Sequence, residues 1–233
     1  MAGVVRGLAR YFNGGGAPRN AVAALHDAVR AATAADGGLS VAGSPACEAV
    51  LAAMAAVDAA DLGVGPGAWC AAEARSGRRC DVWHVPVAES PDYSICVFLL
   101  GPGARIPAHD HPGMTVLSKI LQGSLDVASF DILADNGDGT FAAAARRRTV
   151  EAPRFSELYA TRDNVHEFVA GPEGACVLDV LSPPYDAAGG RDCHYVRVVR
   201  ADGAAAVLEV YADGVEKNRL QTSLSRSNRS RFG

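Results

Sequence analysis

Two closely spaced histidines, His109 and His111, are the residues of this sequence best suited to bind a metal ion. Side chains two positions apart on an extended strand point to the same face, so both imidazoles could reach one ion. A histidine pair also occurs by chance on protein surfaces. Here the pair follows an apolar strand-like segment and precedes a proline-glycine turn. This context favours a metal site, because barrel interiors often hold ligand sites.

A third ligand must come from elsewhere in the chain. His166 is the first candidate, because it opens a late strand-like segment. Two barrel strands far apart in sequence can face each other across the lumen. The other candidates are His84 beside Trp83, His26 on an expected outer helix, and His194. His194 stands between Cys193 and Tyr195, which are candidates for a role of their own.

The histidine pair is not followed by a carboxylate. Barrel metal sites with this pair commonly carry glutamate four residues later, where this chain has Thr115. Non-haem iron oxygenases usually bind iron through two histidines and a carboxylate. Three neutral imidazoles would leave the charge of a ferrous ion uncompensated, and an anionic substrate would offset it. A thiolate suits this role because iron stabilises deprotonated sulfur, so the ligand set favours a thiol substrate.

Short strand-like segments joined by glycine turns predict an antiparallel barrel or jelly roll from about residue 69 onward. Two helices precede it. Apolar residues at helical spacing predict the first over residues 20–33, and Ser44-Pro45 is typical of the start of the second. We expect both helices to pack on the outside of the barrel. The expected strands are residues 82–87, 93–100, 115–121, 125–132, 147–151, 156–159, 166–169, 176–181 and 194–200.

Four regions follow from this pattern: an N-terminal arm, a helical segment packed on the barrel, the barrel, and a flexible tail rich in serine, arginine and asparagine. Their expected bounds are residues 1–19, 20–68, 69–212 and 213–233.

The composition is that of a soluble globular protein, with 49% hydrophobic and 21% charged residues. A net charge of −4 argues against nucleic acid as the main partner, because phosphate binding requires a basic surface. The longest apolar stretch, residues 49–57, is shorter than the about 20 residues of a membrane span, so we expect no membrane insertion. The absence of a heptad pattern leads us to expect a monomer.

Six cysteines are spread through the chain without C-x-x-C spacing, which favours reduced thiols in a cytoplasmic compartment. The first 19 residues carry three arginines and no acidic residue, which also fits a mitochondrial presequence. We therefore expect a cytoplasmic protein, with a mitochondrial location as the alternative. Most of the cysteines should pack as small apolar side chains: Cys47, Cys70, Cys80, Cys96 and Cys176.

Three motifs together carry a resemblance to a known family. They are IPAHDHPGMTV at residues 106–116, VLDVLSPPY at residues 177–185 and GRDCHY at residues 190–195. In this order they make the sequence similar to the thiol dioxygenase family of cysteamine (2-aminoethanethiol) dioxygenase and the plant cysteine oxidases. The likeness covers residues 81–200, about half of the chain.

The resemblance implies a mainly β protein with a cupin-type double-stranded β-helix, or jelly-roll barrel, that binds ferrous iron, Fe(2+), through His109, His111 and His166. The implied reaction inserts both atoms of O2 into a thiol and gives a sulfinic acid. The implied substrates are cysteamine, or peptides and proteins with an N-terminal cysteine, whose oxidation in this family serves oxygen sensing. The His-Asp-His spelling is nearer to the cysteamine enzymes and residues 114–116 to the plant ones, so both subfamilies stay open.

Four more residues are candidates for catalytic roles. Asp179 stands in an apolar strand, where a buried carboxylate is costly unless paired. It could orient a ligand histidine, meet the substrate amine, act as a structural hydrogen-bond acceptor or face outward. Cys193 and Tyr195 would share one strand face, and the resemblance implies that they can be covalently linked; the alternative is two ordinary barrel-lining residues. Tyr185 follows two prolines and is expected at the pocket mouth.

Other functions fit the same histidines. One is a cupin metal enzyme of another class, such as a zinc or manganese isomerase, because three imidazoles bind many divalent ions. The other is a cupin binding module without catalysis. Oxygen uptake linked to sulfinate formation distinguishes the dioxygenase from both.

Overall fold

Two long bent strands form the frame of the fold. The structure is a computed structural model that describes residues 20–35, 37–65, 68 and 81–210. In it, β4 (Thr115–Asp135) and β7 (Val165–Ser182) pair antiparallel on both sides of a bend. At this bend Gly123 has a φ of 71°, and a Cβ there would lie 2.0 Å from the carbonyl oxygen of Gly174. Glycine therefore lets the two backbones approach, and the four separate strands expected here are two continuous ones.

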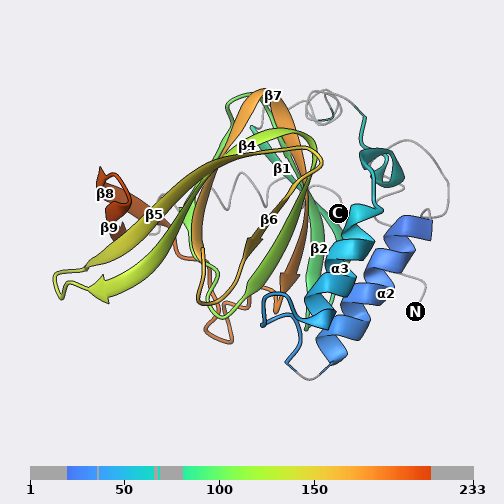
Figure 1. Cartoon of the computed structure of the whole chain (residues 1–233), viewed down its shortest axis with the longest axis horizontal. Helices are drawn as coiled ribbons and strands as arrows, with labels where there is room; N and C mark the ends of the chain where they lie inside the picture. The colour runs from blue at the N-terminus through green and yellow to red at the C-terminus, as the bar shows by residue number, and fades with distance from the viewer. Residues whose placement is uncertain (1–19, 36, 66–67, 69–80, 211–233) are drawn as a thin grey trace, which may run out of the picture.

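The remaining strands extend this frame into a curled, barrel-like sheet (Figure 1). On one half, β1 (Val82–Glu89) pairs with β2 (Ser94–Leu100), β2 pairs with β7, and β6 (Phe155–Leu158) pairs with β4. On the other half, β3 (Arg105–His109) pairs with β7, and β5 (Thr140–Glu151) joins β4 to β9 (Ala205–Val210) and β8 (Val196–Asp202). The predicted mainly β, cupin-type barrel is confirmed.

Two helices, α2 (Asn20–Ala34) and α3 (Pro45–Ala55), pack against the β2 side of the sheet, followed by a short 3-10 helix, η1 (Ala59–Leu62) (Figure 1). The predicted cap is present, because the Ser44 side chain accepts a hydrogen bond from the Cys47 backbone N–H. The predicted apolar face is buried in one core cluster with β1, β2 and β7; its members on α2 are Val22, Leu25, Val29 and Ala32. Packing of both helices outside the barrel is therefore confirmed.

A buried lysine of the barrel forms hydrogen bonds with the end of α3. Lys119 of β4 is 3% exposed, and its Nζ donates to the backbone carbonyls of Met54, Ala55 and Val57 at 3.1, 2.9 and 2.8 Å. These carbonyls belong to the last turn of α3 and the residues after it, where acceptors lack the donor that the next helical turn would supply. The Met54 carbonyl also accepts from the Val57 backbone N–H at 3.1 Å. A positive charge at this end also opposes the negative end of the helix dipole.

We expect Lys119→Met to destabilise the fold, because it fills the space but removes the side-chain donor to the carbonyls of Met54, Ala55 and Val57, of which Met54 keeps a backbone donor. The free energy of unfolding should fall by about 2 kcal/mol. Urea unfolding followed by circular dichroism measures this. Arg147→Met is the control, since Arg147 is exposed on β5 and its replacement should change stability little. An unchanged unfolding midpoint for Lys119→Met would show that Lys119 does not hold α3.

Some expectations concern residues outside the described ranges. They include the arm at residues 1–19, the packing of Cys70 and Cys80, and the flexible tail. No helix among the described residues is long and apolar enough to cross a membrane.

Candidate metal centre

Three buried histidines converge inside the barrel. Each of His109, His111 and His166 offers one ligand atom, and these atoms all lie within 4.8 Å of one another. The ring centroids are 4.6 to 4.9 Å apart, and the residues are 9%, 3% and 4% exposed. Within the described part of the chain no carboxylate belongs to this cluster. The structure therefore brings together the three histidines that the resemblance implied.

The local reason for this convergence differs from the one inferred from sequence. His109 is the last residue of β3, but His111 lies beyond the strand in a turn, so strand alternation does not align the pair. The turn is closed by the Met114 backbone N–H, which donates to the His111 carbonyl at 3.0 Å. His166 is the direct antiparallel neighbour of His109, and it does not lie across the lumen. Two of the ligands thus meet by strand pairing and the third by a turn.

Backbone carbonyls orient two of the rings. The Nδ1 of His109 lies 2.8 Å from the carbonyl oxygen of Pro107, and the Nδ1 of His111 lies 3.2 Å from that of Asn164. A carbonyl oxygen only accepts, so each Nδ1 must carry the proton in these bonds. The Nε2 atoms are then unprotonated and have lone pairs for a metal.

Burial keeps the three rings neutral. Loss of solvent lowers the pKa of His109 and lowers those of His111 and His166 well below the ordinary value, and the neighbouring imidazoles lower the latter two further. Neutral imidazole is the form that binds metals. Three buried and neutral nitrogen donors, two of them oriented by backbone carbonyls, therefore fit a divalent metal ion, with ligand positions left for a substrate.

Aromatic side chains flank two of the histidines. The ring of Tyr195 lies 5.8 Å from that of His109, and the ring of Tyr185 lies 5.5 Å from that of His111. Burial raises the pKa of both phenols, and the thiol of Cys193 interacts with both. The Tyr185 hydroxyl donates to the Asp110 carbonyl at 2.6 Å, which fastens it to the turn between the ligands.

The prediction that Cys193 and Tyr195 share a strand face is wrong in its geometry. Cys193 lies before β8 in irregular structure, and Tyr195 forms an isolated bridge with His109. A loop therefore brings Cys193 to Tyr195, and this loop contacts the site directly. A covalent link between the two stays a prediction.

Asp179 lies in the wall of the barrel. It is 4% exposed on β7, opposite Cys96 of β2 and Ser118 of β4. Burial raises the pKa of its carboxyl to about 7, and a hydrogen bond with Ser118 opposes this. Its Oδ1 is buried without a hydrogen-bond partner among the described residues. Asp179 therefore does not face outward. Its roles as a partner of a ligand histidine, of the substrate amine or of the barrel itself stay predictions.

The histidines that sequence analysis ranked lower are not part of the cluster. His84 packs on Phe98 with ring centroids 5.1 Å apart, and the His26 Nε2 lies 2.9 Å from the Tyr93 hydroxyl. His194 is exposed and pairs with Asp110 at 2.9 Å. Sequence analysis missed Asn164, which contacts His111; its position two residues before His166 was the only local signal.

Comparison with known proteins gives a family match. The family model described as PCO_ADO matches residues 53–228, which include all three histidines, Asp179, Tyr185, Cys193 and Tyr195. Among solved structures, the chain is similar to an RmlC-like cupin from Shewanella frigidimarina, with 15% identity, 47% of this chain and 82% of that chain covered, and a TM-score of 0.36.

Several named relatives match the same region. A probable 2-aminoethanethiol dioxygenase of Dictyostelium discoideum is 34% identical over 140 residues, covering 56% of this chain and 62% of the relative. The 2-aminoethanethiol dioxygenase of Homo sapiens is 36% identical, with 51% and 53% covered. Plant cysteine oxidase 2 of Arabidopsis thaliana is 35% identical, with 58% and 51% covered. The matched region thus spans between half and two thirds of each relative.

Proposed function

Because this chain belongs to the PCO_ADO family, we propose that it is an iron-dependent thiol dioxygenase. Its substrate is cysteamine or an N-terminal cysteine of a peptide or protein. The reaction is R–SH + O2 → R–SO2H, in which both oxygen atoms become bonded to sulfur and no further oxidant or reductant is consumed. Action on N-terminal cysteine would make the product depend on oxygen supply, which suits an oxygen sensor.

One observation carries this proposal. His109, His111 and His166 form a buried, neutral metal site to which no described carboxylate contributes. A divalent ion held by these residues keeps its full charge, so the site favours an anionic ligand. A thiolate is such a ligand, and the named relatives are thiol oxidising enzymes. An isomerase or a binding module has no comparable support from the described residues.

Ferrous iron is the metal proposed, and when bound it supplies the redox chemistry that joins dioxygen to sulfur. The protein supplies position and electrostatics. The hydrogen bonds from His109 and His111 to backbone carbonyls hold the Nε2 atoms toward one point. The rings of Tyr195 and Tyr185 pack beside those of His109 and His111.

Asp179 is proposed to bind the substrate amine. Its unpartnered Oδ1 can accept a hydrogen bond from an ammonium group, which cysteamine and N-terminal cysteine share. A pairing of this kind would satisfy the buried acceptor and would orient the carbon chain that carries the thiol. Cys193 is kept as a candidate for a covalent link to Tyr195, because the thiol of Cys193 and the phenol of Tyr195 interact in this structure.

A comparison of substrates tests the proposed function. We expect the iron-loaded protein to consume oxygen with cysteamine or with a peptide that begins with cysteine, and to give a product heavier by about 32 Da, the mass of two oxygen atoms. An oxygen electrode and mass spectrometry measure both quantities. The matched peptide that begins with serine, and the acetylated cysteine peptide, should give no product. Absence of oxygen uptake with every thiol, in a protein that holds iron, would rule out the dioxygenase.

A further inference from the structure

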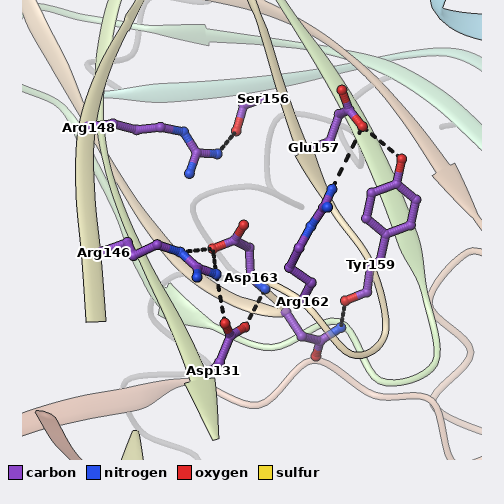
Figure 2. A network of polar contacts seen from close by, with 9 residues as sticks. Asp131, Arg146, Arg148, Ser156, Glu157, Tyr159, Arg162 and Asp163 are labelled. Atoms are coloured by element: carbon purple, nitrogen blue, oxygen red, sulfur yellow. Dashed lines mark hydrogen bonds and ion pairs between the residues drawn. The ribbon is translucent and has the colours of Figure 1, made fainter. Parts of the chain in front are cut away.

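A network of charged side chains links β4, β5 and the loop before β7 (Figure 2). Arg146 of β5 donates from Nε and Nη2 to Asp163 Oδ1 at 3.2 and 2.7 Å, and from Nη2 to Asp131 Oδ2 at 2.6 Å. Asp131 of β4 also accepts from the Asp163 backbone N–H. Three segments far apart in sequence are thereby joined: the end of β4, the middle of β5 and the loop before β7. We call Asp131, Arg146 and Asp163 the arginine network.

The network holds a residue in an uncommon conformation. Asp163 has a φ of 55°, in the left-handed region that few side chains adopt, and it is 7% exposed. A buried carboxylate is costly without a partner, and Arg146 supplies a paired contact. The backbone N–H of Asp163 donates a hydrogen bond to the Asp131 carboxylate. The backbone at Asp163 is thus fixed by side chains from two strands, and its conformation sets the position of the next residue.

The next residue, Asn164, is the one that contacts His111. Its side-chain amide donates to the His111 carbonyl at 2.8 Å and to the Tyr159 carbonyl at 3.2 Å. Its side-chain oxygen accepts from the His111 backbone N–H at 3.3 Å, and its backbone carbonyl accepts from the His111 Nδ1. His111 lies outside any strand, so its three bonds to Asn164 supply the restraint that a sheet gives to His109 and His166.

We propose that the arginine network positions His111 for metal binding by fixing Asn164. Arg146, Asp131 and Asp163 are positioning residues, because they act through Asn164 and touch neither the histidine rings nor a substrate. The inference rests on the three-histidine metal site of the proposed function. It does not depend on thiol oxidation, and it holds for any divalent ion bound there.

The arrangement explains why a charged network serves this purpose. One guanidinium lies between two carboxylates, and its planar fork contacts both. If the guanidinium is removed, the carboxylates of Asp131 and Asp163 repel each other across a partly buried space. Residues 163–164 would then relax, and the His111 ring would lose the carbonyl that fixes its Nδ1. Partners that orient a metal ligand typically contribute about 10- to 100-fold in metal affinity.

Binding of Co(2+) to the full chain tests the inference without any substrate. We expect Arg146→Gln to raise the dissociation constant for Co(2+) by about tenfold. The visible spectrum of the bound ion should also change, because the His111 nitrogen is displaced. Arg146→Lys keeps the charge but lacks the planar fork, so it should restore part of the affinity. Arg147→Gln is the matched control, because Arg147 is the exposed neighbour on β5. It should bind Co(2+) as the native protein does.

A double variant distinguishes positioning from a general loss of stability. Asn164→Ala removes the two side-chain bonds to His111 but keeps the backbone carbonyl that accepts from its Nδ1, so it should weaken Co(2+) binding by itself. If the network acts through Asn164, adding Arg146→Gln should then weaken binding by clearly less than Arg146→Gln does alone, because linked residues are not additive. Additive losses would overturn the inference. So would a native spectrum and affinity in Arg146→Gln, or an equal loss in Arg147→Gln. If the native protein binds Co(2+) and the variants behave as expected but no thiol is oxidised with iron, the proposed function fails and the network remains.

Discussion

Replacement of His166 by alanine should give a folded protein that no longer retains iron and no longer oxidises thiols. His166 supplies one of three nitrogen donors, and the strand pair with His109 keeps the backbone in place without its ring. Loss of a residue that only orients a ligand costs about 10- to 100-fold, so loss of a ligand should lower metal affinity by about 100-fold or more. Metal analysis after gel filtration and oxygen uptake with cysteamine measure the two effects.

The matched control for this variant is His84→Ala. His84 is a partly buried imidazole of the same sheet, and loss of solvent lowers its pKa as well, but it packs on Phe98 outside the metal cluster. It should keep native iron content and turnover, with only a moderate loss of stability from the cavity. A His166→Ala protein with full iron content and normal turnover would remove His166 from the ligand set and would require a different third ligand.

The sequence allowed the three clustered histidines to be predicted as a group, although the local argument for it was incomplete. The spacing of His109 and His111 pointed to a metal site, and the resemblance completed the set with His166. The structure joins these residues by a strand pair and a turn, and strand alternation does not join them. Residue types thus indicated the chemistry, while the backbone path through His111 depended on contacts with a loop about fifty residues later.

The fold was predictable where hydrophobic periodicity is regular and less so where strands bend. The apolar face of α2 followed helical spacing and is buried as expected. Gly123 looked like the end of a strand, yet it lets β4 continue past Gly174 as one bent strand. β3 and β9 were missed, since β3 contains a proline and β9 is short and begins with alanines. Burial does alternate along most of each strand, but the residue types do not reveal this alternation.

The arginine network could not be inferred from the sequence alone. Asp131, Arg146 and Asp163 are common surface residue types, and no spacing rule joins them. Their association follows from the register of β4 on β5, which places Arg146 opposite Ser129, and from Ser129 standing opposite His166 on β7. Register is a property of the assembled sheet, so residues that support a site from neighbouring strands become visible only in the structure.

The second large effect concerns Asp179 and catalysis. Asp179→Asn keeps the shape of the side chain but removes the negative charge beside which an ammonium group would bind. We expect iron content to stay native and kcat/KM for cysteamine to fall by about 30-fold or more, because breaking a buried charge pair costs about 2 kcal/mol or more. A thiol of similar size without an amine, such as 2-mercaptoethanol, should be oxidised equally slowly by both proteins. An equal loss for both thiols would show that Asp179 does not bind the amine.

The same substitution should make the metal-free protein more stable at neutral and higher pH. Burial raises the pKa of the Asp179 carboxyl from 3.8 to about 7, so the folded state binds a proton that the unfolded state has already lost. Stability therefore falls as pH rises from the unfolded pKa to the folded one, and the full cost is present above about pH 7. A difference of about three pKa units corresponds to about 4 kcal/mol. Asparagine carries no charge and avoids this cost.

Urea unfolding of both proteins at two pH values measures this cost. The Asp179→Asn protein should unfold at a higher urea concentration at pH 8, and the difference should vanish below about pH 3, where the native carboxyl is protonated in both the folded and the unfolded state. A variant that is more stable but slower would indicate that the buried charge of Asp179 is retained for function, because a structural acceptor would be expected to stabilise the fold. A variant less stable than the native protein at pH 8 would instead assign Asp179 to the support of the barrel through Ser118.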